Sequence, residues 1–140
     1  MAKTLTTQTI SNELAETLMR GAVAKAEAMG VPMCIAICDP SGALVQFLRM
    51  DRAALLSVNI AQDKAYTAVS FGMATHEWHD FIKDDAPLLH GIVHTPRLVV
   101  FGGGYPIKVD GEVVGGIGVS GGHYSHDMEV ALAGLAAAGL

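Results

Sequence analysis

The sequence lacks long apolar runs and clusters of basic residues. No run of about 18 apolar residues occurs in its 140 positions, so a membrane-spanning helix is not expected. The nine lysines and arginines are scattered along the chain, and the formal net charge is −5. Proteins that bind nucleic acids or anionic membranes typically gather basic residues on one face. We therefore expect neither nucleic acid nor membrane among the partners.

Cysteine is scarce, with only Cys34 and Cys38 present. They lie four residues apart on a predicted strand, which separates their Cα atoms by about 13 Å at roughly 3.3 Å per residue. A disulfide needs these atoms within roughly 7 Å, so both residues are expected to be reduced thiols, as is usual in the cytoplasm. The N-terminal residues do not resemble a signal peptide. These features predict a cytoplasmic protein.

Several catalytic motifs are also absent: G-x-S-x-G, C-x-x-C, a phosphate loop and an acidic metal cluster. The segment 76–79 is not the zinc-protease motif H-E-x-x-H, because its second histidine comes one residue early. G-x-G-x-x-G does occur at 116–121. It follows a predicted hairpin, however, and a dinucleotide site needs this motif to open the helix of a βαβ unit. Neither a metal site nor a nucleotide site is therefore expected.

The chain is rich in apolar residues, at 51% hydrophobic and 16% charged. Its length favours a single domain over residues 1–140. A fold of this size leaves about 30% of the chain surface exposed. We interpret the apolar excess as a subunit interface and expect a homo-oligomer. A monomer with an apolar ligand pocket is the alternative.

The predicted elements follow the order αββααβββα. They are a helix from Thr6 or Thr7 to Met29, strands at 31–38 and 43–49, helices at 57–71 and 75–84, a strand at 97–101, a hairpin at 105–120 and a helix at 125–138. Runs of strands separated by helices favour an α+β fold, with a five-stranded antiparallel sheet flanked by helices. Residues 85–96 show no periodicity and are interpreted as a loop that covers a pocket.

The glycine-rich stretch 102–127 is the most informative part of the sequence. Asp110-Gly111 predicts a type I′ turn between two strands, because both residues accept positive φ angles. After the second glycine cluster a helix is expected, capped by Ser125, with Asp127 in its first turn. Backbone amides and the positive end of a helix then meet at 120–127, which suits a carboxylate or another anion.

Three segments carry a resemblance to a known family: 103–121, with the run VDGEVVGGIGVSG, 127–135, and 60–68. Together with 39–42 and 49–51 they resemble the GlcG/HbpS family over nearly the whole chain. That family includes haem-binding proteins and the C-terminal domain of some corrinoid adenosyltransferases. The resemblance implies a profilin-like fold, with a lysine, here Lys64, pointing towards the ligand cleft.

The six histidines form three pairs, His76/His79, His90/His94 and His123/His126, and none precedes residue 76. His123 and His126 lie at the predicted helix start. The positive end of a helix favours the neutral imidazole, which can bind iron or act as a base. Histidines in an exposed, glycine-rich segment without any role are the alternative.

Binding of haem or a related tetrapyrrole beside residues 115–127 is the first hypothesis, and no other cofactor is expected. The residues expected to bind it are Arg49, Tyr105, Gly118, Ser120, His123 and His126. In some haem-binding relatives a histidine of the first helix ligates the iron, and this chain has none there.

Two alternatives remain open, so the sequence does not decide whether the protein is an enzyme. One is cofactor-independent proton transfer on a small carboxylate or aromatic catabolite. In that case Lys64 and the helix start hold the carboxylate, and Asp127 or His126 moves the proton. The other is an oligomerisation module without a ligand, which predicts no pocket beside residues 118–127.

Overall fold

Four antiparallel strands form one sheet, in the order β2-β1-β4-β3. The strands are β1 (Cys34–Cys38), β2 (Leu44–Arg49), β3 (Gly104–Val109) and β4 (Glu112–Ser120). The helices are α1 (Asn12–Met29), α2 (Leu55–Phe71), α3 (Trp78–Ile82), α4 (Ala86–Gly91) and α5 (Tyr124–Ala137), with short 3-10 helices η1 (Thr75–Glu77) and η2 (Ile92–His94). The computed structural model describes residues 1–140.

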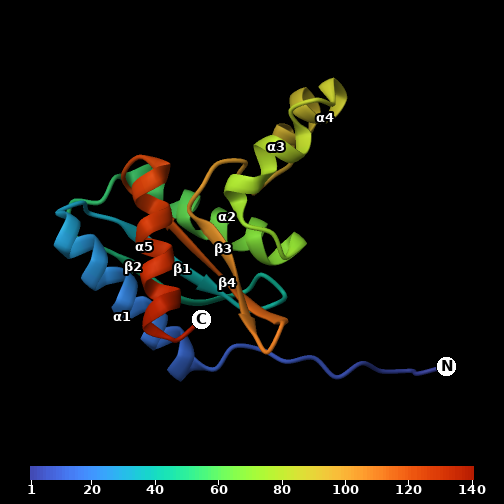
Figure 1. Cartoon of the computed structure of the whole chain (residues 1–140), viewed down its shortest axis with the longest axis horizontal. Helices are drawn as coiled ribbons and strands as arrows, with labels where there is room; N and C mark the ends of the chain where they lie inside the picture. Colours follow the sequence, from blue (N-terminus) through green and yellow to red (C-terminus); the bar gives the residue numbers. More distant parts are fainter.

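The sheet lies between two helical layers of unequal size. Figure 1 shows α1 and α5 side by side on one face of the sheet and α2 on the other. The predicted α+β class with an antiparallel sheet is therefore confirmed. No helix combines the length and the apolar character that crossing a bilayer requires.

The face towards α1 and α5 carries the large aliphatic side chains. Alternate residues of β1 and β4, such as Ile35, Ile37 and Ile117, point to this face, as the period of two in a strand dictates. They pack on small and aliphatic residues of the two helices, among them Leu18 and Ala22. This layer is the main hydrophobic core.

The face towards α2 is built from small residues. A Cβ atom at Gly118 would overlap the carbonyl oxygen of Ala61, and one at Gly116 would lie 2.5 Å from the carbonyl oxygen of Ala65. The backbone of α2 therefore rests directly on β4, and only glycine permits this approach. The glycine run of the sequence is thus a helix-packing surface.

The prediction of five strands is wrong, because residues 97–101 form no strand. Their backbone groups bond to a side chain of α2. The Thr67 hydroxyl donates to the carbonyl oxygen of Arg97 at 2.8 Å and accepts from the amide of Val99 at 3.0 Å. Arg97 also has a φ of 67°, outside the β region. The segment consequently runs along α2 and adds nothing to the sheet.

Several other predictions also change, among them the strand start at 31, now Cys34, and the helix start at 57, now Leu55. The first helix starts at Asn12, because Ser11 provides the cap by accepting from the Leu14 amide. Residues 85–96, predicted as a loop, contain α4 and η2; these elements are too short to show an apolar period in the sequence. The cap of α5 is His123, where Ser125 was expected.

Helices α3 and α4 project away from the sheet (Figure 1). We call residues 78–94, which contain them, the arm. Trp78 anchors this arm: it is fully buried, and its ring packs edge-on against Phe71 at the end of α2, with 5.0 Å between ring centroids. Beyond Trp78 the arm packs on its own elements, and Phe81 stays exposed.

Candidate functional site

The hairpin turn forms as the sequence predicts. Asp110 and Gly111 have φ angles of 51° and 81°, as a type I′ turn requires. The turn pairs β3 with β4 so that Gly104 lies opposite Gly118. The end of β4 and the residues before β3 thereby reach the N-terminus of α5.

A fully buried ion pair occupies this meeting point. Lys64 Nζ donates to Asp127 Oδ2 at 2.8 Å and to the carbonyl oxygen of Val119 at 2.9 Å. The side chains of the two ionic partners are 0% and 3% exposed. The lysine Nζ also lies 5.0 Å from the centre of the Phe101 ring. The structure thus brings together the two residues that the sequence placed in one cleft, but it leaves them no contact with solvent.

Burial dominates the electrostatics of this pair. It raises the pKa of Asp127 and lowers the pKa of Lys64, and the opposite charge of each partner counteracts both shifts. The amide of Gly122 donates to Asp127 Oδ1 at 3.1 Å and further stabilises the carboxylate. A Cβ atom at Gly103 would lie 2.6 Å from Lys64 Nζ, so this glycine makes room for the ion pair.

The anion site expected at 120–127 is therefore filled by the protein's own carboxylate. Asp127 accepts the hydrogen bond of the Gly122 amide, which would otherwise be free to bind an anion. Ser120 is buried, and its hydroxyl bonds to that of Ser57 at 3.2 Å. Gly118 lies beneath α2. Neither Ser120 nor Gly118 faces an open cleft.

An open pocket of about 430 Å³ lies next to the ion pair, between the arm and the N-terminus of α5. Its lining residues are His76, His79, Asp80, Val100, Phe101, Gly102 and Tyr124, and we name it the His76 pocket. The two histidines come from η1 and α3, whereas Phe101 and Tyr124 belong to the body of the fold. Their three-residue spacing was visible in the sequence, but without a fold nothing linked it to Phe101.

No group of three or more histidine, cysteine or acidic side chains is arranged to hold a metal ion. A free metal ion at His76 and His79 would therefore lack the further protein ligands that it needs.

The other predicted residues lie outside the lining of this pocket. His123 caps α5, with its Nδ1 accepting from the Ser125 amide at 3.2 Å, and its ring lies 4.1 Å from that of Tyr124. His126 is exposed on the first turn of α5. Neither histidine lines the pocket, whereas Tyr124, which lies between them in the sequence, does.

Tyr105 and Arg49 lie on opposite edge strands, β3 and β2. The Tyr105 ring is half-buried, and its centre lies 5.6 Å from that of His76. Arg49 donates through Nε and Nη2 to the carbonyl oxygen of Ala53. Tyr105 is thus a neighbour of the His76 pocket, and Arg49 is not.

The family model described as "Haem degrading protein HbpS-like" matches residues 10–136. The chain belongs to the HbpS-like family. It is 40% identical over 121 residues to the corrinoid adenosyltransferase PduO of Salmonella typhimurium, in a match that covers 86% of this chain and 36% of PduO. The chain therefore spans about a third of the length of this curated relative.

Two solved structures are similar over nearly their full lengths. The Klebsiella pneumoniae protein ORFY has a TM-score of 0.93 at 30% identity, covering 99% of this chain and 97% of ORFY. The PduOC:haem complex has a TM-score of 0.86 at 37% identity, covering 92% of this chain and 94% of PduOC.

Proposed function

We propose that this HbpS-like chain binds haem or a related tetrapyrrole in the His76 pocket. The observation that carries the proposal is the composition of the pocket wall, where two imidazoles lie beside the rings of Phe101 and Tyr124. Haem iron takes a histidine as an axial ligand. Aromatic and apolar side chains with a few polar groups are the usual lining of a cofactor site.

The similarity to PduOC supports this proposal, because that protein was solved as a haem complex. The size of the pocket supports it as well. A volume of about 430 Å³ falls within the roughly 300–1,000 Å³ of typical small-molecule sites.

The histidines, the aromatic rings and a neighbouring lysine have different roles in the proposal. His76 or His79 ligates the iron, and Phe101 and Tyr124 pack on the macrocycle. Lys83 pairs with Asp80 at the rim, with 3.2 Å between Nζ and Oδ1, and is 47% exposed. Its ammonium group is thus available to a propionate.

Three of the residues expected from the sequence, His123, Tyr105 and Lys64, contact lining residues of the pocket. The His123 ring contacts that of Tyr124 at a tilt of 36°, and Tyr105 lies beside His76. The buried Lys64 lies against the Phe101 ring and fixes that wall. In this proposal these residues position the wall and do not touch the iron.

Proton transfer by Lys64 and Asp127 has less support. A substrate carboxylate would have to displace Asp127 from a lysine that is fully buried and already bonded. A module without a ligand also has less support, because a pocket lined by Tyr124 does lie beside residues 118–127. We retain the proposals that residues 1–140 act as one domain and that this domain assembles with copies of itself.

Titration of the purified chain with hemin tests haem binding. We expect a shifted Soret band, and the double variant His76→Ala/His79→Ala should lower the affinity at least about tenfold. His90→Ala is the matched control, because His90 is exposed on the same arm outside the pocket. Native mass spectrometry of the same samples gives the subunit number and the haem stoichiometry.

A wild-type protein without a Soret shift would refute the proposal. An unchanged Soret shift in the double variant would refute the assigned ligands. If His123→Ala/His126→Ala alone abolished the shift, the ligands would be those first expected from the sequence.

A further inference from the structure

The most exposed large apolar side chains of the helices and strands gather at the two ends of α2. Leu55 and Leu56 in its first turn are 75% and 77% exposed. Phe71, its last residue, is 65% exposed, and Phe81 on the arm is 62% exposed. Clustered apolar side chains at the surface of a protein typically mark a contact with another molecule. Both ends of α2 are therefore candidates for an interface.

The surface at the start of α2 is apolar and carries a positive charge. We name Arg52, Leu55 and Leu56 the leucine patch. Arg52 is exposed and forms no ion pair within the chain. The first turn of α2 contains no acidic residue. The segment 49–56 holds two arginines and one aspartate, and its net charge is thus +1.

The surface at the other end of α2 is aromatic and carries a negative charge. The rings of Phe71 and Phe81 both pack edge-on against the buried Trp78, with centroid distances of 5.0 and 5.9 Å. We name the two phenylalanines the aromatic patch. Asp84 follows three residues after Phe81, is exposed and forms no ion pair within the chain. The arm holds three aspartates and one lysine, so its charge is −2 when its histidines are neutral.

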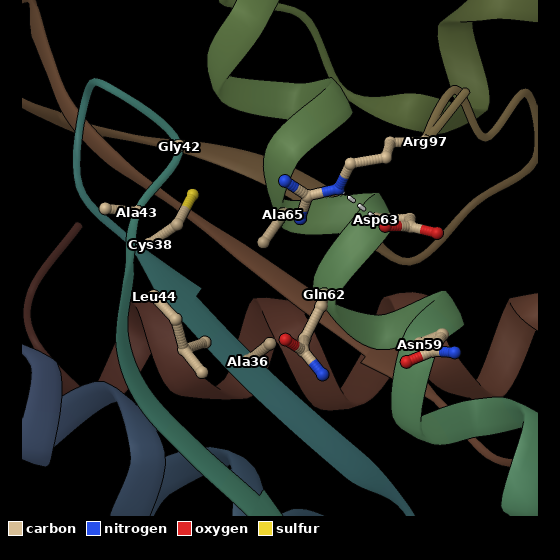
Figure 2. A pocket seen from close by; sticks show the side chains of 10 residues that line it. All are labelled: Ala36, Cys38, Gly42, Ala43, Leu44, Asn59, Gln62, Asp63, Ala65 and Arg97. Atoms are coloured by element: carbon tan, nitrogen blue, oxygen red, sulfur yellow. Dashed lines mark hydrogen bonds and ion pairs between the residues drawn. The ribbon is translucent and has the colours of Figure 1, made fainter. Parts of the chain in front are cut away.

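The two patches are too far apart to meet within one copy. Helix α2 has 17 residues, which span about 25 Å at roughly 1.5 Å per residue. Polar side chains also separate the patches. Asn59 and Asp63 follow Leu56 at spacings of three and four, and thus lie on the same side of the helix. In the pocket drawn in Figure 2, Asp63 is already paired with Arg97 at 2.9 Å.

We propose that the aromatic patch and the arm of one copy dock on the leucine patch of a second copy. The phenylalanine rings pack on the two leucines, and Asp84 pairs with Arg52. The charges select this contact over the two symmetric ones. Two arms in contact would bring a charge of −2 against −2, and two leucine patches would bring Arg52 against Arg52.

The proposed contact joins different surfaces of the two copies, and it is therefore head-to-tail. A dimer built in this way leaves one leucine patch and one aromatic patch unfilled, so further copies add until a ring closes. The proposal rests on the self-assembly retained above and specifies its surfaces. It does not rest on haem binding, because neither patch includes a residue that lines the His76 pocket.

Native mass spectrometry of the full chain without hemin tests the contact. The wild-type chain should form a closed oligomer with a defined number of subunits. Leu55→Ser/Leu56→Ser should raise the dissociation constant at least about a hundredfold, because it removes the apolar centre of the contact. Leu132→Ser is the matched control and should leave the oligomer intact, since Leu132 is a 48% exposed leucine of α5 outside both patches.

Charge reversal tests the assigned ion pair. Arg52→Asp and Asp84→Arg each place like charges at the contact and should weaken it at least about tenfold. The two reversals in one chain should restore the wild-type oligomer. Position 52 has a φ of 68°, which aspartate tolerates better than most residues with a side chain. Thermal unfolding of each variant confirms that it is folded.

A mixture of two defective chains distinguishes a head-to-tail contact from a symmetric one. Leu55→Ser/Leu56→Ser keeps an intact arm. Phe81→Ser/Asp84→Arg keeps an intact leucine patch. Together they should form a heterodimer and nothing larger, because only one of the two possible contacts is intact.

Three outcomes would overturn the docking surfaces alone. They are a homodimer of either defective chain, an oligomer that survives Leu55→Ser/Leu56→Ser, and a double reversal that fails to restore the oligomer. A monomeric wild-type chain would overturn both these surfaces and self-assembly itself, and would leave haem binding untouched.

Discussion

The two faces of the sheet use opposite ways of packing a helix. Towards α1 and α5 the strands present isoleucine and valine, and the helices are held off by a layer of aliphatic side chains. Towards α2 the strands present glycine, alanine and cysteine, and the helix backbone lies on the strand. The aliphatic face contributes buried apolar area, whereas the α2 face fixes the position of the α2 backbone relative to β4 with geometric precision.

This precision explains how a lysine comes to be fully buried. Because α2 lies so close to β4, the side chain of Lys64 reaches the end of the strand, where it binds the Val119 carbonyl oxygen, and the first turn of α5. An aliphatic spacer layer would hold it short of Asp127. The two faces should therefore differ in how much stability is lost when a single carbon atom is added or removed.

Breaking the ion pair of the α2 face should have the largest effect. Asp127→Asn leaves Lys64 buried without a counter-charge, and we expect a loss of about 3–5 kcal/mol in the free energy of unfolding. Chemical denaturation measures this loss. Because the pKa of Lys64 is lowered in the folded protein, the unfolded chain binds more protons up to the ordinary lysine pKa of 10.5. The variant should therefore regain stability as the pH rises towards that value.

Two controls accompany this experiment. Lys64→Met/Asp127→Leu removes both charges and should recover much of the loss, since apolar pairs often replace buried ion pairs well. Glu129→Gln disrupts the exposed 3.9 Å pair with Lys25 and should cost less than about 1 kcal/mol. A loss below about 1 kcal/mol in Asp127→Asn would contradict the importance assigned to the pair.

Adding one carbon to the α2 face should have an intermediate effect. Gly118→Ala places a methyl group against the Ala61 carbonyl oxygen, and we expect a loss of about 1–3 kcal/mol as α2 is pushed away. Thermal or urea unfolding measures it. Gly91→Ala is the control, because a Cβ atom at Gly91 meets nothing within 4 Å. Equal stability of these two variants would show that α2 does not rest on β4.

Removing one carbon from the aliphatic face should have the smallest effect. Ile117→Val leaves a small void among flexible side chains, at a cost of about 0.5–1.5 kcal/mol. Ile92→Val, at a half-buried position of the arm, should cost less. The contrast between the faces would be lost if Ile117→Val destabilised the protein more than Gly118→Ala does.

The regular elements were predictable from local chemistry. The type I′ turn follows from Asp110-Gly111, and the course of α1 follows from its apolar period and the stop at Gly30. The false fifth strand has the apolar composition of a strand. Only the hydroxyl of Thr67, some 30 residues earlier in the sequence, directs its backbone groups elsewhere. No local pattern carries that information.

The site was predictable in part. The resemblance pointed Lys64 towards a cleft, the sequence put Asp127 in the first turn of the last helix, and the structure joins them at 2.8 Å. Their burial did not follow from the pattern, because it depends on how closely glycine lets α2 approach the sheet. The His76 pocket combines segments that are distant in sequence, so only the folded chain places its residues together.

The two sides of the His76 pocket come from different parts of the fold. Phe101 and Tyr124 belong to the body of the fold, but His79 and Asp80 lie on the arm. Its attachment runs through the Thr75 hydroxyl, which accepts from the Gly104 amide at 2.9 Å, and through the buried ring of Trp78. The two sides of the pocket are thus attached to the sheet separately, and a ligand that touches both would join the arm to the body of the fold.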